Sequence, residues 1–253
     1  MTDVTDLQQQ TPDEATQADM QVVADDADLG INHYVGETDV AVVAFTGIGH
    51  GMGAIQQDEF VGSALGADRN HVISIIDRKR SWYSAKGMQA HILDTVLRLK
   101  ADLGVRRVVT LGNSMGGFGA LLFAERFGAD TAVAFVPQYT MRNDFAEPRW
   151  RPYREQMVEQ NLATLGPFLN GKTKAYAFFG ADDVRDRMHV RRLRAHCIID
   201  VIEVAGSDHN NLTAFLKREG VLAPLISAMI SRDTAEVTRL TTPLTEHAPT
   251  GAS

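Results

Sequence analysis

The sequence contains one cysteine, Cys197, in 253 residues. A single cysteine excludes an internal disulfide, which is typical of proteins from a reducing compartment. No lysine or arginine precedes Arg69, so the N-terminal part lacks the basic start of a secretory or mitochondrial signal. We therefore expect a cytoplasmic protein.

Long apolar runs and an excess of basic residues are also missing. No stretch reaches the length of a membrane-spanning helix, so we expect no membrane insertion. The formal net charge is −7, which argues against partners such as nucleic acid or an anionic membrane surface. Composition leaves open whether the chain is a monomer or a homo-oligomer.

The two ends of the chain differ in composition from its middle. Residues 1–20 are polar and acidic, and residues 234–253 are rich in threonine and other polar residues, so we expect both ends to be disordered. The middle, residues 21–233, shows no repeat and no linker, which predicts a single domain. Residues 139–171 could form a small cap on it.

Short apolar, β-branched runs alternate with longer amphipathic runs through this domain. The alternation predicts an α/β fold with a mostly parallel central sheet and helices on both faces. An antiparallel pair of edge strands is expected near residues 21–24 and 31–35. The other expected strands are 39–46, 71–77, 107–112, 131–137, 174–180 and 198–205, and the expected helices are 55–65, 86–103, 115–127, 186–197 and 220–231.

The stretch "VVTLGNSMGGFGALLFAE" changes from a strand pattern to a helix pattern at Ser114. Glycines surround this serine, and residues 112–116 match the pattern G-x-S-x-G. A tight turn at this place holds the hydroxyl clear of the sheet and points the next N–H group into the same space. A serine that only caps the helix is the simpler alternative.

This corner resembles the nucleophile elbow of α/β-hydrolases. The resemblance implies a serine, an acid and a histidine in that order along the chain. The acid expected after the strand "KAYAFFG" is Asp183, with Asp186 as the rival, since Asp186 could instead cap the following helix. A metal site built from this acidic cluster and His189 is disfavoured because the spacing does not fit one.

His209 follows the last expected strand, in the loop "GSDHNN". A histidine in a short polar loop could simply be solvated. With a serine elbow upstream, we expect His209 to act as general base and then general acid.

The remaining expected site residues bind the oxyanion or the substrate. One oxyanion donor is the N–H of Met115, and a second is the N–H of Gly47 or Ile48 in the glycine-rich loop "FTGIGHGMGA". Expected substrate-binding aromatics are Trp82, Tyr83, Tyr139 and Trp150. No metal and no organic cofactor is implied.

A narrower resemblance rests on "RSWY", "NSMGGFGALLF", "AFVPQ" and "DHNNLTAFLKREGVL". These stretches look like a little-characterised bacterial subgroup of α/β-hydrolase-like proteins, some of which belong to surface-polysaccharide or glycan pathways. An aspartate at the Asp186 position, paired with His189 in a D..H pattern, recurs in that subgroup. Both Asp183 and Asp186 therefore remain candidates for the catalytic acid.

These observations predict a serine esterase of the α/β-hydrolase fold with a minimal cap. It would act on a small-molecule or glycan ester, or a thioester, through an acyl-enzyme. Acyl transfer to a sugar and a catalytically silent binding role remain alternatives. A third is a dinucleotide-binding oxidoreductase, because Gly49-x-Gly51-x-x-Ala54 follows a strand and Asp77 ends the next one.

Overall fold

The computed structural model describes residues 20–49, 55–141, 148–158 and 164–245. In these residues one sheet has the strand order β1-β2-β4-β3-β5-β6-β7-β8. Neighbours from β4 to β8 run parallel, and β1 and β2 are antiparallel at one edge. The strands are β1 Met20–Asp25, β2 Leu29–Tyr34, β3 Val40–Phe45, β4 His71–Asp77, β5 Arg107–Asn113, β6 Thr131–Phe135, β7 Lys174–Gly180 and β8 Asp200–Val204.

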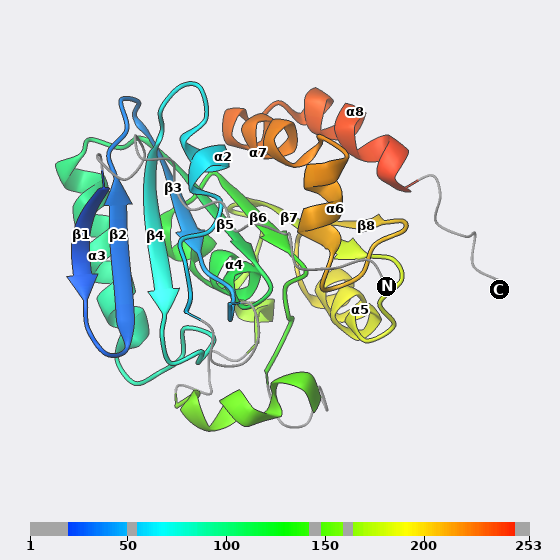
Figure 1. Ribbon diagram of the computed structural model, residues 1–253, viewed down its shortest axis with the longest axis horizontal. Coiled ribbons are helices and arrows are strands. Elements are labelled where there is room, and N and C mark those ends of the chain that lie inside the picture. Colours follow the sequence, from blue (N-terminus) through cyan, green and yellow to red (C-terminus); the bar gives the residue numbers. More distant parts are fainter. Residues whose placement is uncertain (1–19, 50–54, 142–147, 159–163, 246–253) are drawn as a thin grey trace, which may run out of the picture.

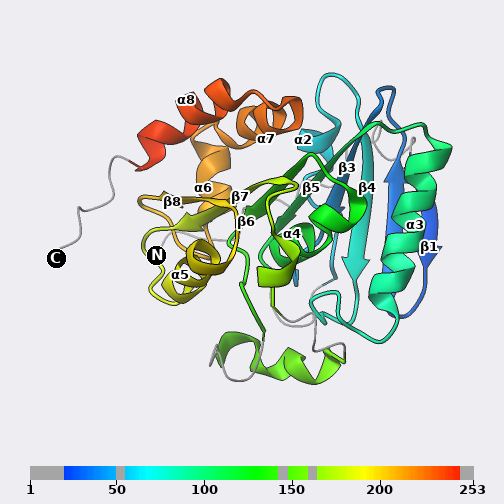
Figure 2. The same cartoon turned by 180° about the vertical axis from the view of Figure 1, so that it is seen from behind.

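Helices cover both faces of this sheet (Figures 1 and 2). Helices α3 and α4 pack against each other on one face, and α2 and α7 pack together on the other. All residues of β3, β4 and β6 are buried, as central parallel strands require. The helices are α2 Val61–Leu65, α3 Met88–Asp102, α4 Met115–Phe127, α5 Asp186–His196, α6 Leu212–Arg218, α7 Leu222–Ser231 and α8 Thr234–Thr245; two 3₁₀ segments are η2 Pro148–Gln156 and η4 Gly166–Phe168.

The predicted alternation of strands and helices is confirmed, and the last helix corrects one expectation. Residues 234–245, assigned above to a disordered tail, form α8. The helix buries Val237 and Thr241 and packs against α7 and β8. The carboxylate of Asp233 accepts the N–H of Glu236, which stabilises the first turn. A buried face and a cap offset the weak helix propensity of the threonines.

Helix α4 lies directly on the sheet because Gly116 and Gly117 in its first turn place no side chain between the helix and the strands. A Cβ atom added at Gly116 would lie 2.0 Å from the carbonyl oxygen of Phe45. This close approach fixes the start of α4, and with it Ser114, against β3.

We expect Gly116→Ala to lower the free energy of unfolding by about 3 kcal/mol or more, because backbone must move to admit the methyl group. Urea denaturation of the purified variant measures this loss. The control is Gly62→Ala in α2, where an added Cβ has no neighbour within 4 Å. That change should raise stability by up to about 1 kcal/mol through helix propensity. Equal stability for both variants would contradict the close packing of α4.

A buried histidine pair joins β2 to β4. His33 Nε2 lies 3.1 Å from His71 Nδ1, and the N–H of Gly36 also donates to that Nδ1 atom. Burial, helped by the nearby His71, lowers the pKa of His33 to about 4. Both rings are therefore neutral at pH 7.

The contribution of His33 to folding stability should fall as the pH drops from 6.5 towards 4. In that window the unfolded chain takes up a proton on His33 and the folded chain does not, so each pH unit costs up to about 1.4 kcal/mol for this group. Burial raises the pKa of Glu59 to about 7 and that of Asp77 to about 6, and these carboxyls act in the opposite direction, so the test compares proteins. Urea denaturation across the window should show that His33→Gln loses less stability per pH unit than the wild type does, whereas replacement of the exposed His91 by Gln should leave the slope unchanged. Identical slopes in all three proteins would refute this contribution.

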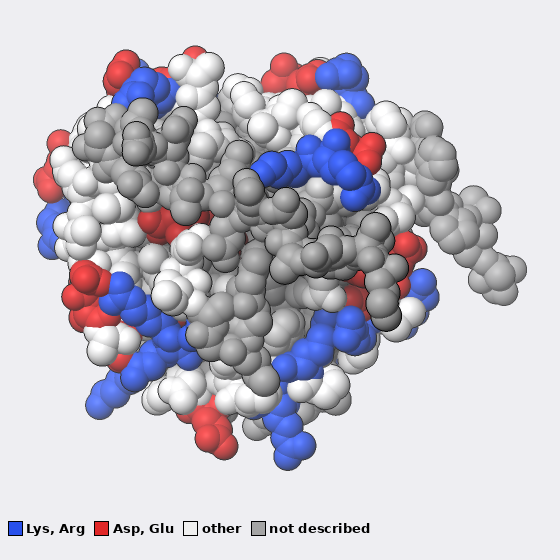
Figure 3. Space-filling view, viewed as in Figure 1, with Lys and Arg blue, Asp and Glu red and all other residues white. Residues whose placement is uncertain are grey.

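Charged side chains of both signs share the face shown in Figure 3. At the antiparallel edge of the sheet, Lys79 pairs with Asp28 and Arg78 pairs with Asp25. None of the described helices is long and apolar enough to cross a bilayer.

Candidate active site

Ser114 stands at the turn between β5 and α4 with a backbone that non-glycine residues rarely adopt. Its φ is 54° and its ψ is −115°. The turn places the hydroxyl at the carboxyl end of the sheet, where parallel α/β folds bind ligands. Four other non-glycine residues with positive φ, Arg80, Trp82, Tyr83 and Val136, belong to the loops after β4 and β6. Backbone strain thus gathers in the loops around Ser114.

His209 and Asp186 extend from Ser114 in a line of hydrogen bonds. His209 Nδ1 lies 2.8 Å from Asp186 Oδ2, and His209 Nε2 lies 3.1 Å from Ser114 Oγ. A carboxylate only accepts hydrogen bonds, so Nδ1 carries the proton and Nε2 is left to accept the serine O–H. All three side chains are buried, with Asp186 1% exposed.

The two candidate acids have exchanged the roles that the sequence favoured. Asp183, the preferred acid, does not contact His209 in the described hydrogen bonds. Its Oδ1 accepts the N–H groups of Arg185 and Asp186, so Asp183 caps the start of α5. Asp186, which could have been the cap, reaches the imidazole instead.

Asp183 is surrounded by positive charge. Burial alone would raise its pKa, but hydrogen bonds from the Arg185 side chain and backbone, with the charge of Arg149, lower the pKa of Asp183 to about 2. The group is therefore ionised at neutral pH. The acidic cluster proposed above as an unlikely metal site is in fact paired with guanidinium groups and a histidine.

The segment η2 lies beyond the carboxyl ends of the strands and covers this site (light green, lower part of Figure 1). The Trp150 ring lies 5.8 Å from the His209 ring, centroid to centroid. Trp150 and Tyr153 also pack against Trp82, at 5.6 and 5.8 Å. This aromatic contact holds η2 over the histidine.

Gln138, which the sequence reading did not select as a site residue, contacts the serine. Its Nε2 lies 3.4 Å from Ser114 Oγ, and its Oε1 accepts the indole N–H of Trp82 at 2.8 Å. Because an indole N–H can only donate, Trp82 fixes the amide with its NH₂ group towards the serine. The "PQ" of "AFVPQ" was the available signal, but no spacing rule ties it to the elbow.

Two of the three expected oxyanion donors remain available. Met115 is the first residue of α4, so its N–H has no acceptor within the helix. Within the described residues, the Ile48 N–H has no hydrogen-bond acceptor. The N–H of Gly47, in contrast, donates to Glu59 at 2.9 Å. This bond fixes the loop and removes Gly47 as a donor to substrate.

The expected substrate-binding aromatics occupy different positions. Trp82 and Tyr83 are 0% exposed, so they support the site from behind and do not fit the expectation that they touch substrate. Tyr83 donates its O–H to the Thr46 carbonyl, beside the Gly47 loop. Tyr139 is also buried and packs near His196, whereas Trp150 is the aromatic next to His209.

The structure does not favour a dinucleotide site at Asp77. This carboxylate is fully buried, and its Oδ2 accepts the N–H groups of Ser81 and Tyr83 and the O–H of Ser81. A ribose could not reach it. Residues 50–54 of the glycine pattern lie outside the described part of the chain.

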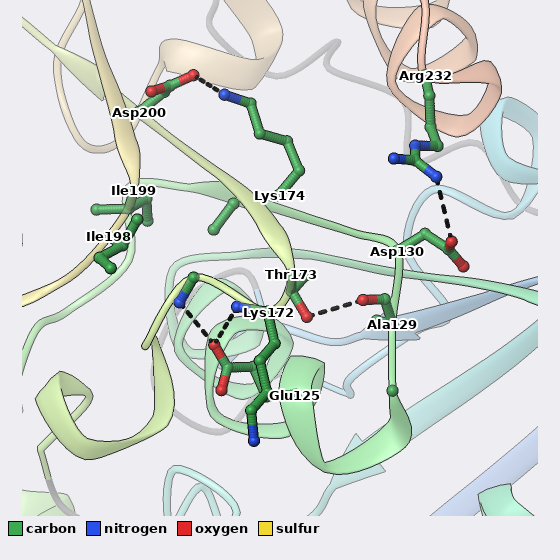
Figure 4. A pocket seen from close by; sticks show the side chains of 13 residues that line it. Glu125, Ala129, Asp130, Lys172, Thr173, Lys174, Ile198, Ile199, Asp200 and Arg232 are labelled. Atoms are coloured by element: carbon green, nitrogen blue, oxygen red, sulfur yellow. Dashed lines mark hydrogen bonds and ion pairs between the residues drawn. The ribbon is translucent and has the colours of Figure 1, made fainter.

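A cleft of about 560 Å³ opens at the opposite end of the sheet (Figure 4). Its charged groups bond to the protein itself: Lys174 pairs with Asp200, and Glu125 accepts three backbone N–H groups of residues 170–172. The cleft lies at the amino ends of β7 and β8, away from Ser114. The triad-like cluster is thus the stronger candidate site.

The strand order, the serine elbow and the histidine loop together define the α/β-hydrolase fold. Solved structures agree. A capsule O-acetyltransferase of Neisseria meningitidis serogroup A superposes with a TM-score of 0.62 at 15% identity, covering 79% of this chain and 92% of its own. Esterase 2 of Thermogutta terrifontis gives 0.54 at 18% identity, covering 81% and 97%. FphF, a fluorophosphonate-binding serine hydrolase of Staphylococcus aureus, gives 0.55 at 14%, covering 83% and 97%.

No protein-family model and no curated protein matches the sequence. At these identities the structural likeness establishes the fold alone. Activity must therefore be argued from the site.

Proposed function

We propose that this protein is a serine hydrolase that cleaves carboxylic esters or thioesters through an acyl-enzyme on Ser114. The observation that carries the proposal is the line of hydrogen bonds from Ser114 Oγ through His209 to Asp186, at 3.1 and 2.8 Å. A serine that only capped its helix would not need an imidazole on its hydroxyl. The described Ser114 side chain also makes no hydrogen bond that caps α4.

The chemistry follows from the tautomer that Asp186 imposes. His209 Nε2 takes the serine proton as Ser114 Oγ forms a bond to the carbonyl carbon. The imidazolium then gives that proton to the leaving alcohol or thiol as its bond to carbon breaks. Water then attacks the acyl carbon as His209 Nε2 takes one of its protons. The imidazolium gives that proton to Ser114 Oγ as the acyl–oxygen bond breaks, which releases the acid and restores the serine.

Donors for the developing oxyanion are the N–H groups of Met115 and Ile48, the latter from the loop fixed by Glu59. Gln138 adds a donor on Ser114 Oγ itself, which stabilises negative charge there as the proton leaves. These donors are held in place before substrate binds, which is the condition for strong electrostatic catalysis.

The test of the proposal is a panel of chromogenic esters of increasing acyl length, with acetylated sugars and a thioester alongside. We expect turnover of at least one class and full inhibition by a fluorophosphonate. A properly folded protein that turns over none of them and resists the inhibitor would instead support a binding role.

Acyl transfer is a second candidate, favoured by the cover over the site. Ser114 is only 8% exposed and His209 only 7%. A site that limits access to water lets a bound hydroxyl compete for the acyl-enzyme. A capsule O-acetyltransferase shares the fold, so a sugar hydroxyl is the acceptor to test. Acylated sugar formed from an activated ester would favour transfer, and release of free acid alone would favour hydrolysis.

A further inference from the structure

Arg149 connects η2 to the two carboxylates beside the histidine. One guanidinium nitrogen lies 2.8 Å from Asp186 Oδ1, and another lies 3.5 Å from Asp183 Oδ2. The Arg149 side chain is only 14% exposed. It reaches Asp186 from the side opposite His209, so the two oxygens of this carboxylate have different partners.

Each oxygen of Asp186 is therefore held. Oδ2 accepts His209 Nδ1–H, and Oδ1 accepts the arginine. A buried carboxylate with a single hydrogen bond could rotate about its last torsion and would keep one oxygen unsatisfied. The hydrogen bond from the guanidinium, together with that from His209, restricts this rotation.

We propose that Arg149 is a positioning residue for the Asp186–His209 pair, an inference that rests on the proposed serine hydrolase function. Its hydrogen bond to Asp186 Oδ1 leaves Asp186 Oδ2 aimed at the imidazole Nδ1–H.

Arg149 also orders the cover of the site. Its guanidinium carbon lies 5.5 Å from the centre of the Trp150 ring, which faces His209. One side chain thus links the acid, the histidine and η2. The site is complete only when η2 is in place.

The experiment compares kcat and KM of Arg149→Met, Arg149→Lys and the control Arg185→Met. For Arg149→Met we expect kcat to fall about 10- to 100-fold with little change in KM, because the variant loses a hydrogen bond to a charged group and keeps its substrate contacts. Arg149→Lys should recover part of this loss, because an ammonium group can still donate a hydrogen bond to Asp186.

Arg185→Met removes a guanidinium that contacts Asp183 but not Asp186, and Arg185 is half exposed. It should lower kcat less than Arg149→Met does. A rise in KM as large as the fall in kcat in Arg149→Met, or no recovery in Arg149→Lys, would overturn the proposal. An equal loss of kcat in Arg185→Met and Arg149→Met would overturn it as well.

A second readout does not depend on turnover. The ¹H signal of His209 Nδ1–H, which donates to Asp186, can be followed by NMR in the wild type and the variants, and circular dichroism checks folding. We expect this signal to move in Arg149→Met and to move less in Arg185→Met. If no ester is cleaved and yet this change is seen, the proposed function fails and the positioning role stands. If esters are cleaved and no change is seen, the positioning role fails and the proposed function stands.

Discussion

Replacement of Ser114 by alanine is expected to abolish ester turnover, with kcat lowered about 10⁴- to 10⁶-fold. The acyl-enzyme route requires the oxygen that the substitution removes, and no other described hydroxyl is within hydrogen-bond distance of His209 Nε2. Steady-state kinetics on the best ester of the panel measures the loss.

The variant should fold normally. Ser114 makes no side-chain cap, and alanine enters the same backbone conformation without added bulk. Its thermal midpoint should therefore stay close to that of the wild type. A folded Ser114→Ala protein with near-normal turnover would mean that the chemistry occurs elsewhere.

The second large effect is expected for Asp186→Asn, which should lower kcat about 10⁴-fold. Arg149 donates to one side of this group, so the amide oxygen should turn towards the arginine and the NH₂ group towards His209. An NH₂ group facing Nδ1 forces the ring proton onto Nε2. His209 Nε2 can then no longer accept a hydrogen bond or a proton from the Ser114 hydroxyl. Kinetics on the folded variant tests this.

Asp183→Asn is the matched control three residues away. Asparagine can still cap α5, and Asp183 does not touch His209, so kcat should change less than about 10-fold. Weaker pairing with Arg149 and Arg185 should cost about 1–3 kcal/mol of unfolding free energy. If Asp183→Asn lost as much activity as Asp186→Asn, the acid would have been assigned to the wrong residue.

The order of strands and helices was predictable because each element carries its own pattern. Runs such as "VAVVAF" and "TAVAF" are apolar on both faces, and parallel sheets require that. The glycines around Ser114 were equally informative, since only close packing of a helix on the sheet explains them all. These local signals do not depend on distant parts of the chain.

The choice between Asp183 and Asp186 could not be made from the sequence. Both lie near the turn after β7, and which one caps α5 depends on the two arginines that surround Asp183. One of these, Arg149, comes from a segment more than thirty residues earlier. Its contact exists only once η2 has folded over the site.

Two other features that were not predicted from the sequence depend on tertiary contacts in a similar way. The side-chain amide of Gln138 becomes a site group because the indole of Trp82, far away in the chain, orients it. For α8 a local signal did exist: Asp233 and Glu236 have the spacing of a capping box. The threonine-rich composition made this capping signal hard to recognise. Burial of Val237 and Thr241 stabilises the helix.

The most direct measurement is peptide mapping of the protein after treatment with a fluorophosphonate. We predict one stoichiometric adduct on the peptide that contains Ser114. This adduct should form far more slowly when His209 is replaced by alanine. An adduct on another residue, or none on a folded protein, would contradict it.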